Sequence, residues 1–251
     1  MKLRIGTRRS RLALAQAQEV AVRLEALGMR SELVPMETAG DRGAPADASR
    51  AGLKGLFVAE ISRALHDGLV DVAVHSAKDM AAEDEDDLVI AAVPERASPL
   101  DVLVTREDGL APGSVVGTSS PRRQSQVFRW RPDVIVKEMR GNVDTRLRKL
   151  AEGDSGELDA IVLARAGLQR LGREDALGAV LDPATFVPAP GQGVLALEGR
   201  EGDRRRADAD LPAGRAGARA RAWSELPHAA GSARGDGRRR TRAPAGVGRP
   251  P

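Results

Sequence analysis

The sequence predicts an α/β protein with two domains, each built on a parallel or mixed β-sheet, around an interdomain cleft. Short, almost wholly apolar runs such as 70–74 and 88–93 alternate with longer segments whose apolar residues recur at helical spacing. Such alternation is typical of buried parallel strands covered by helices on both faces. Pro94 and Pro99 then separate two sets of such elements, and ligand sites commonly lie between two domains.

The first set opens with a strand at 3–6 and a helix at 11–27. Val20 and Leu24 lie at helical spacing on that helix, and Gly28 is a typical stop. A glycine also follows the second helix of this set, where it suits the helix end. The set continues with strands at 31–36, 70–74 and 88–93 and a helix at 58–66.

The second set follows the same alternation. It has strands at 101–105, 115–116, 134–136 and 160–164 and helices at 121–130 and 143–150, and a final strand at 194–197 follows it. We assign residues 1–97 and 194–202 to the first domain and 98–193 to the second. The sequence itself shows no internal repeat.

Charge and composition set residues 203–251 apart from the rest. They hold 12 of the 39 basic residues and 5 of the 36 acidic ones, which leaves a mildly acidic body of 27 basic against 31 acidic residues. The acidic body, and the presence of only five aromatic residues in the whole chain, argue against a nucleic-acid surface. No apolar run is long enough to span a membrane, and the N-terminus does not resemble a secretory signal, so we expect a cytoplasmic protein.

The segment 203–251 is rich in Arg, Ala, Gly and Pro and has no periodic apolar face. One interpretation is a disordered basic extension. The other is a slip of the reading frame near residue 203, because these four amino acids share G/C-rich codons and the composition changes abruptly.

Five polar segments carry the chemistry, and four of them follow a strand-like run. They are TRRS (7–10), HSAKD (75–79), GTSSPRR (117–123), RGNVDTR (140–146) and PAPGQG (188–193). Together they place six arginines, a lysine and several hydroxyl groups at expected strand ends. Arginine binds carboxylates through two parallel hydrogen bonds, so three such segments indicate a ligand with several carboxylates. Phosphate stays an alternative, although no phosphate-binding glycine pattern occurs.

In GTSSPRR, Ser120 and Pro121 suit the cap and first position of a helix. Free backbone N–H groups there can bind an anion. Arg122 and Arg123 lie in the same first turn, where cations oppose the helix dipole, which suggests a functional reason for them. A solvated arginine pair is the alternative.

HSAKD brings a candidate catalytic carboxylate, Asp79, to the end of a buried strand. Lys78 would lower the pKa of Asp79 and burial would raise it. A carboxylate facing arginines can stabilise a developing cation and shuttle protons. The alternative is an exposed Asp–Lys pair. His75 is expected to be a hydrogen-bonded structural residue, and the spacing of the three histidines suits no metal site.

Taken in order, these motifs resemble hydroxymethylbilane synthases, also called porphobilinogen deaminases. The resemblance covers about residues 1–200 and is carried by RIGTRRSRLALAQA, GLKGLFVAEI, VDVAVHSAKDM, VVGTSSPRRQ, RGNVDTRLRKL, DAIVLARAGLQRL and PAPGQGVLALE. It implies two domains of the periplasmic binding-protein type and a monomeric transferase. Such enzymes join four porphobilinogen molecules, with loss of ammonia at each step, into a linear tetrapyrrole of the porphyrin and haem pathway.

The resemblance also implies roles for single residues. Asp79 would be the catalytic acid and base, and Gln192 would lie at the hinge between the domains. The residues implied to hold side-chain carboxylates of substrate or cofactor are Arg8, Ser10, Ser76, Lys78, Thr118, Ser120, Arg122, Arg123, Arg140, Arg146 and Gln192.

The chain departs from this family in one decisive respect. The family primes synthesis with a dipyrromethane cofactor held by a thioether to a cysteine in a small α+β third domain, whereas this sequence has no cysteine. The tail at 203–251 would then be a frameshifted remnant of that domain. We therefore expect impaired synthesis. Two alternatives stay open, namely a non-catalytic cleft that binds a small polycarboxylate or another anion and, less favoured, a nucleic-acid binder that uses its basic tail.

Overall fold

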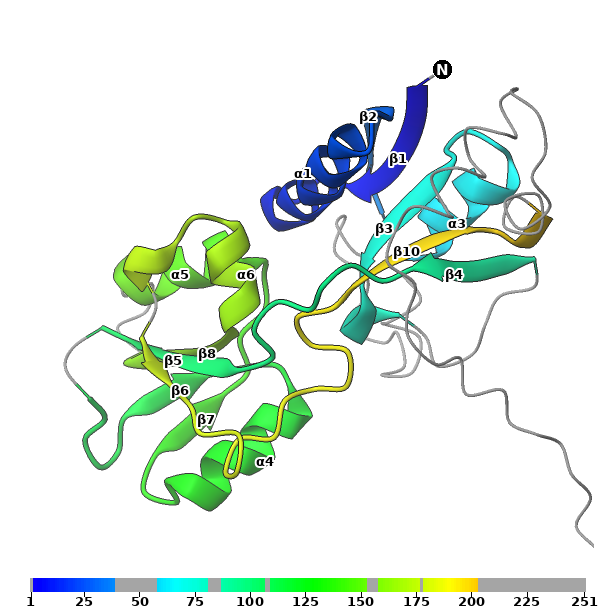
Figure 1. Ribbon diagram of the computed structural model, residues 1–251. Coiled ribbons are helices and arrows are strands. Elements are labelled where there is room, and N and C mark those ends of the chain that lie inside the picture. Colours follow the sequence, from blue (N-terminus) through cyan, green and yellow to red (C-terminus); the bar gives the residue numbers. More distant parts are fainter. Residues whose placement is uncertain are drawn as a thin grey trace, which may run out of the picture.

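The computed structural model describes residues 2–38, 58–80, 87–106, 109–152, 158–176 and 178–202. It contains two five-stranded mixed sheets, each with helices packed on it, joined by two chain crossings (Figure 1). The predicted fold class is thereby confirmed. The tail at 203–251 lies outside the described residues. None of the described helices has the length and apolar character needed to cross a membrane.

The first sheet combines strands from the start and the end of the described chain. In sheet order it contains β2 (Arg30–Met36), β1 (Lys2–Arg8), β3 (Val72–Ser76), β10 (Leu195–Arg200) and β4 (Leu88–Ala92). β1 runs parallel to β2 and β3, whereas β10 runs antiparallel to both β3 and β4. The last described strand therefore lies inside the sheet rather than at its edge.

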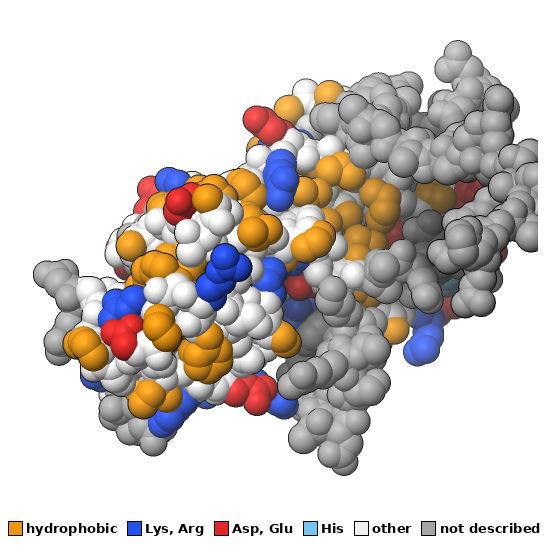
Figure 2. Space-filling model, turned by 90° about the horizontal axis from the view of Figure 1, so that it is seen from below, with side chains coloured by type: hydrophobic (Ala, Val, Ile, Leu, Met, Phe, Trp, Pro, Cys, Tyr) orange, Lys and Arg blue, Asp and Glu red, His pale blue; other side chains and the backbone are white. Residues whose placement is uncertain are grey.

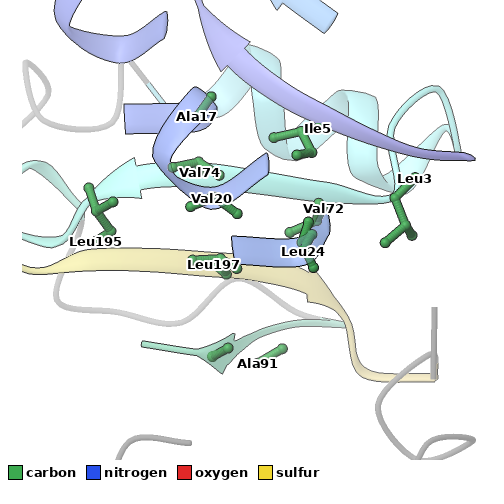
Figure 3. Packing of buried hydrophobic residues seen from close by; sticks show 11 residues of the cluster. Leu3, Ile5, Ala17, Val20, Leu24, Val72, Val74, Ala91, Leu195 and Leu197 are labelled. Atoms are coloured by element: carbon green, nitrogen blue, oxygen red, sulfur yellow. The ribbon is translucent and has the colours of Figure 1, made fainter. Parts of the chain in front are cut away.

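Two helices cover opposite faces of this sheet. Helix α1 (Arg11–Ala26) packs Val20 and Leu24 on the face that carries alternate residues of β1 and β3 (Figure 3). Helix α3 (Ala59–His66) packs Ile61 on the other face. Full burial of such aliphatic side chains contributes about 1.5–3 kcal/mol each to folding. The strand period of two thus divides the apolar runs between two cores.

The second sheet has the order β7 (Ile135–Lys137), β6 (Val115–Gly117), β8 (Ala160–Ala164), β5 (Asp101–Thr105) and β9 (Ala179–Val180). β6 runs parallel to β7 and β8, and β5 runs antiparallel to β8 and β9. Both sheets therefore share one plan, in which three parallel strands are followed by the strand that arrives from the other sheet. The sequence shows no internal repeat that corresponds to this shared arrangement of strands.

Three helices cover the second sheet. Helix α4 (Pro121–Trp130) packs on one face through Val127, and α5 (Val143–Glu152) and α6 (Arg165–Arg170) pack on the other. Helix α6, β9 and the short 3₁₀ turns η1 (Ala77–Asp79) and η2 (Glu174–Ala176) are elements that the apolar pattern did not predict. The other predicted helices and strands are present within three residues of their expected ends.

The topology brings the polar segments to the carboxyl edges of the two sheets. β1 and β3 are parallel, so their last residues, Arg8 and Ser76, lie at one edge, where Leu195 at the start of β10 pairs with Ser76. In the second sheet, Asp101 at the start of β5 pairs with Ala164 at the end of β8. Loops at such edges are where open α/β sheets bind ligands.

The two crossings between the sheets are hydrogen-bonded to each other. The amide of Ala97 on the first crossing donates to the carbonyl oxygen of Gly193 on the second, at 3.1 Å. Arg96 Nε also donates to the carbonyl oxygen of Gln192, at 3.0 Å. The chain thus leaves and re-enters the first sheet through one paired strap (Figure 1).

Gly191 lets this strap lie directly on the turn η1. Its φ is +69°, and a Cβ built there would lie 3.0 Å from both the carbonyl carbon of Ala77 and the amide nitrogen of Lys78. Gly172 has a similar φ of +64° but has nothing within 4 Å of such a Cβ. A comparison of alanine substitutions at these two glycines therefore separates the effect of backbone conformation from the effect of close approach.

We predict that Gly191→Ala destabilises the protein more than Gly172→Ala. The control loses about 1–2 kcal/mol from the left-handed conformation alone, whereas Gly191→Ala also forces overpacking of about 1–3 kcal/mol. Urea denaturation followed by circular dichroism measures both changes in the free energy of unfolding. Equal losses in the two variants would show that the strap does not press on η1.

Candidate active site

The segment HSAKD forms the end of β3 and the turn η1. Asp79 is exposed to solvent at the last position of that turn. Burial lowers the pKa of Lys78, and the positive charges of Arg123 and Arg122 lower it further, against the opposing effect of Asp79 and Asp101. A lysine of the first sheet therefore lies within electrostatic reach of arginines of the second.

Two neighbours of this turn are held by side-chain hydrogen bonds. Ser76 Oγ accepts from Gln16 Nε2 of α1 at 2.8 Å. His75 lies buried, with its Nε2 3.2 Å from Glu198 Oε2 of β10. This bears out the structural role predicted for His75 and ties β3 to the returning strand.

The segment GTSSPRR forms the cap and first turn of α4, as predicted. Ser120 is the N-cap, and its Oγ accepts from the amide of Arg123 at 3.4 Å, while Pro121 takes the first helical position. Thr118 is fully buried, and its Oγ accepts from the amide of Ser120 at 3.3 Å. The cap hydroxyls are thus partly occupied by the backbone of their own turn.

Arg122 and Arg123 share a carboxylate that the sequence analysis did not identify, that of Asp101. Arg123 Nη2 and Nε lie 2.7 and 3.2 Å from Asp101 Oδ1, and Arg122 Nη2 lies 2.8 Å from Oδ2. Gln192 Nε2 also donates to Oδ1, at 2.9 Å. Asp101 is completely buried. The unfavourable pair of cations at the start of α4 is therefore balanced from within the protein.

The balance of these effects fixes the charge of Asp101. Burial acts to raise its pKa, but the charge of Arg123 and the hydrogen bonds from Arg123, Arg122 and Gln192 outweigh burial and lower it. The carboxylate is consequently ionised at neutral pH. A signal was present in the sequence, since Asp101 opens the otherwise apolar strand DVLVT.

Arg146 and Arg140 come from the segment RGNVDTR, on either side of the start of α5. Arg146 Nη2 donates to Ser119 Oγ at 3.1 Å and its Nε to the carbonyl oxygen of Gly141 at 2.8 Å. Burial and the nearby charge of Arg123 lower the pKa of Arg146. Arg140 is exposed and pairs with Glu138 at 2.9 Å.

The segment TRRS ends β1 and caps α1. Ser10 Oγ accepts from the amide of Ala13 at 3.3 Å, which confirms the predicted helix start. Arg8 is half-buried at the end of β1, and Arg9 is exposed, 3.9 Å from Glu37. Directly after this segment, Arg11 Nη1 donates to Asp144 Oδ1 of the other domain at 2.8 Å.

Two ion pairs thus join the two domains, Arg11 with Asp144 at 2.8 Å and Arg170 with Glu19 at 2.9 Å. Beside them, Gln192 of the second crossing donates to Asp101 at the start of β5. Helices α1 and α6 pack against each other beside them. Hydrogen bonds and charge interactions relate eight of the predicted site residues to this boundary: Lys78, Asp79, Thr118, Ser120, Arg122, Arg123, Arg146 and Gln192. The place of Arg8, Ser10, Ser76 and Arg140 in the site stays a prediction.

Charges of both signs are mixed over the described part of the face shown in Figure 2, where Lys and Arg side chains lie among Asp and Glu. The described residues contain no group of three or more His, Cys, Asp or Glu that could hold a metal ion.

Fold and site together define a class of two-domain α/β proteins whose cationic loops meet at the facing carboxyl edges of two mixed sheets. Residues 3–208 match the family model "Porphobilinogen deaminase, dipyromethane cofactor binding domain". The chain therefore belongs to the porphobilinogen deaminase family.

Curated relatives support this membership. The chain is 47% identical over 208 residues to the porphobilinogen deaminase of Brevibacillus brevis, covering 80% of this chain and 66% of that protein. It is 47% identical over 205 residues to the enzyme of Acidothermus cellulolyticus, covering 80% of this chain and 61% of the relative. The chain thus spans about two thirds of the length of these relatives.

The chain is also similar, at low sequence identity, to several solved structures. They include a periplasmic substrate-binding protein of an ABC transporter from Coxiella burnetii (13% identity, 88% of this chain, 90% of that chain, TM-score 0.48). Another is the lipoprotein Tp32 from Treponema pallidum (14% identity, 88% and 90% coverage, TM-score 0.48).

We predict that Asp101→Asn removes a pH-dependent part of the stability. The lowered pKa of Asp101 means that its ion pairs stabilise the fold above its unfolded pKa, near 4, and that this contribution is lost as the pH falls through the folded pKa. At pH 7 the variant should lose about 3–5 kcal/mol, because the substitution leaves buried arginine charges unpaired.

Urea denaturation of wild type and variant from pH 3 to pH 8 checks this. The difference between their free energies of unfolding should be constant above about pH 5 and shrink below about pH 4. Asp133→Asn is the matched control, because Asp133 pairs with Arg131 at 2.7 Å on the surface of the same domain. A gap that does not narrow in acid would mean that Asp101 is not ionised in the folded protein.

Proposed function

We propose that the chain carries the binding and acid–base machinery for the stepwise deaminative condensation of four porphobilinogen molecules into hydroxymethylbilane. The observation that carries this proposal is that Lys78, the neighbour of Asp79 in η1, lies within electrostatic reach of Arg122 and Arg123 at the start of α4. Family membership supplies the substrate class, since the relatives are named porphobilinogen deaminases.

In this proposal the cationic groups bind the acetate and propionate side chains of the pyrroles. Lys78 and Arg146 are the best placed. Burial and nearby arginine charges lower the pKa of both side chains, and a ligand carboxylate would relieve the repulsion between these cations. Arg123 contributes mainly through Asp101, because its three guanidinium nitrogens are bonded to Asp101 and to the carbonyl oxygen of Val162. The further ligand-binding candidates are Arg8, Ser10, Ser76, Thr118, Ser120, Arg122, Arg140 and Gln192.

Asp79 would perform the proton transfers. The C–N bond of the substrate's aminomethyl group breaks, ammonia leaves after protonation, and an electrophilic azafulvene forms. The α-carbon of a second pyrrole attacks it, the new C–C bond forms, and that α-carbon loses its proton. The carboxylate of Asp79 stabilises the positive charge on the ring nitrogens during these steps and exchanges protons with the departing amine.

The dipyrromethane cofactor of the family fits this chain only in part. The partly buried cations at the sheet edges suit its carboxylates, but the sequence contains no cysteine to form the thioether. We therefore propose that this chain is impaired in synthesis. We also expect a cytoplasmic monomer that works on a small molecule without a nucleic-acid or membrane partner.

The missing thiol favours a second candidate function, which is the capture of a small polycarboxylate without turnover. That function would need the cations but not Asp79. The two functions are separated by Asp79→Asn, which should leave capture intact and abolish turnover.

We predict that the chain carries no covalent pyrrole adduct and forms negligible tetrapyrrole from porphobilinogen. Intact-mass spectrometry of the purified chain and a colorimetric assay of product measure the two properties. A mass increase of one dipyrromethane, or robust turnover abolished by Asp79→Asn, would show that the thiol is dispensable.

The experiment that tests the proposed function uses a version whose coding frame after residue 202 is restored so that a cysteine-bearing third domain follows. We expect this version to turn over porphobilinogen, and its Asp79→Asn variant to bind the substrate but lose at least about a hundredfold in rate. The Asp67→Asn variant, altered at the exposed end of α3, is the control and should keep full activity. Binding without turnover in the restored version would favour the capture function.

A further inference from the structure

Asp101 is the only described residue that contacts Arg122, Arg123 and Gln192 through side-chain bonds at once. Its carboxylate accepts four hydrogen bonds, three of them to Oδ1 and one to Oδ2. The donors come from α4 and from the second crossing, and Asp101 itself ends the first crossing. One buried carboxylate therefore joins three segments that meet at the domain boundary.

The same cluster fixes the strap that lies on η1. Gln192 Nε2 donates to the carbonyl oxygen of Pro99 at 2.6 Å as well as to Asp101, and Arg122 Nη1 donates to the carbonyl oxygen of Val187. The next residue back along the strap from Gln192 is Gly191, which lies on the backbone of Ala77 and Lys78. The position of the Lys78–Asp79 turn is thus linked to Asp101 through two residues.

The charges around Asp101 show why a counter-ion is needed before any ligand binds. Arg123 lowers the pKa of both Lys78 and Arg146, so the cations of the two domains repel one another. Asp101 and Asp79 are the acidic groups that oppose this repulsion at Lys78. Since Asp79 is exposed, Asp101 provides the buried share of the counter-charge.

The cluster also keeps unused hydrogen-bonding capacity. Among the described residues, Arg122 Nε and Gln192 Oε1 are buried polar atoms without a hydrogen-bond partner. Buried polar atoms of this kind are rare and mark places where a water molecule or ligand group can add. One is a donor and the other an acceptor, and both belong to side chains that bind Asp101.

We propose that Asp101 is a positioning residue of this site, which holds the guanidinium groups of Arg122 and Arg123 at the domain boundary and supplies their counter-charge in the absence of ligand. It touches no reacting atom. It acts through the two arginines, and through Gln192 on the turn that carries Lys78 and Asp79. The ligand part of this inference rests on the proposed function, whereas the electrostatic part does not.

The test follows the titration of Lys78 in the full chain. Reductive methylation with ¹³C-formaldehyde keeps each lysine charged and gives one signal for each of the five lysines, and Lys78→Arg identifies the signal of interest. Asp101→Asn should lower the titration midpoint of Lys78, because a charge that favours the ammonium is lost. Arg123→Gln should raise the midpoint, because a charge that opposes the ammonium is lost.

The control and the double variant separate this role from a general loss of structure. Asp133→Asn removes an exposed carboxylate of the same domain and should leave the Lys78 signal unchanged. The double variant Asp101→Asn, Arg123→Gln should lie between the two single variants. If Asp101→Asn alone does not fold, the comparison of the double variant with Arg123→Gln measures the same effect. A Lys78 signal that Asp101→Asn leaves in place, or moves upward, overturns the proposal.

Calorimetric titration of porphobilinogen into the same proteins tests the ligand part. We expect Asp101→Asn to weaken binding at least about tenfold and Asp101→Glu, which keeps the charge, to restore part of the loss. If wild type binds no porphobilinogen, the proposed function fails, and the Lys78 titration still decides the role of Asp101. Binding that is equal in wild type and Asp101→Asn would overturn the positioning role toward the ligand.

Discussion

The buried ion cluster of Asp101 with Arg122 and Arg123 is the interaction on which the domain boundary depends. A carboxylate taken out of water is tolerated only when its lone pairs are satisfied and opposite charges lie next to it. Asp101 meets this condition with donors from α4 and from the strap at Gln192. The two arginines lie at the positive end of a helix, where the helix dipole disfavours their charge. The carboxylate and the arginines therefore stabilise one another.

Topology explains why this cluster sits where the chemistry is expected. In each sheet the strand that arrives from the other domain runs antiparallel, so its first residue lies at the carboxyl edge of the parallel strands. Asp101 begins one such strand, and the PAPGQG segment leads into the other. The same geometry that makes the chain cross twice therefore delivers a counter-ion and a strap to the edge that carries the cationic loops.

The local part of this structure was predictable from the sequence, and the non-local part was not. Apolar periodicity, Ser120 before Pro121, and Gly28 after α1 mark their elements through interactions within a few residues. Helix α6 escaped because its six residues are too short for a clear period. The role of Asp101 was not predicted because its hydrogen-bond partners lie 21 to 91 residues away in the sequence. The two cations at the start of α4 predict an anionic partner, but their spacing in the sequence does not distinguish a ligand from Asp101.

The contrast between Lys78 and Asp79 bears on how such a site would favour a developing cation. Asp79 is exposed, and a charge pair 4 Å apart in water gains only about 1 kcal/mol, against about 4 kcal/mol at the effective dielectric of a protein surface. A pyrrole seated over Asp79 would itself exclude the water and strengthen the attraction to its ring nitrogen. The cations that hold its carboxylates would thus contribute to rate as well as affinity, because they keep the ring in place over that carboxylate.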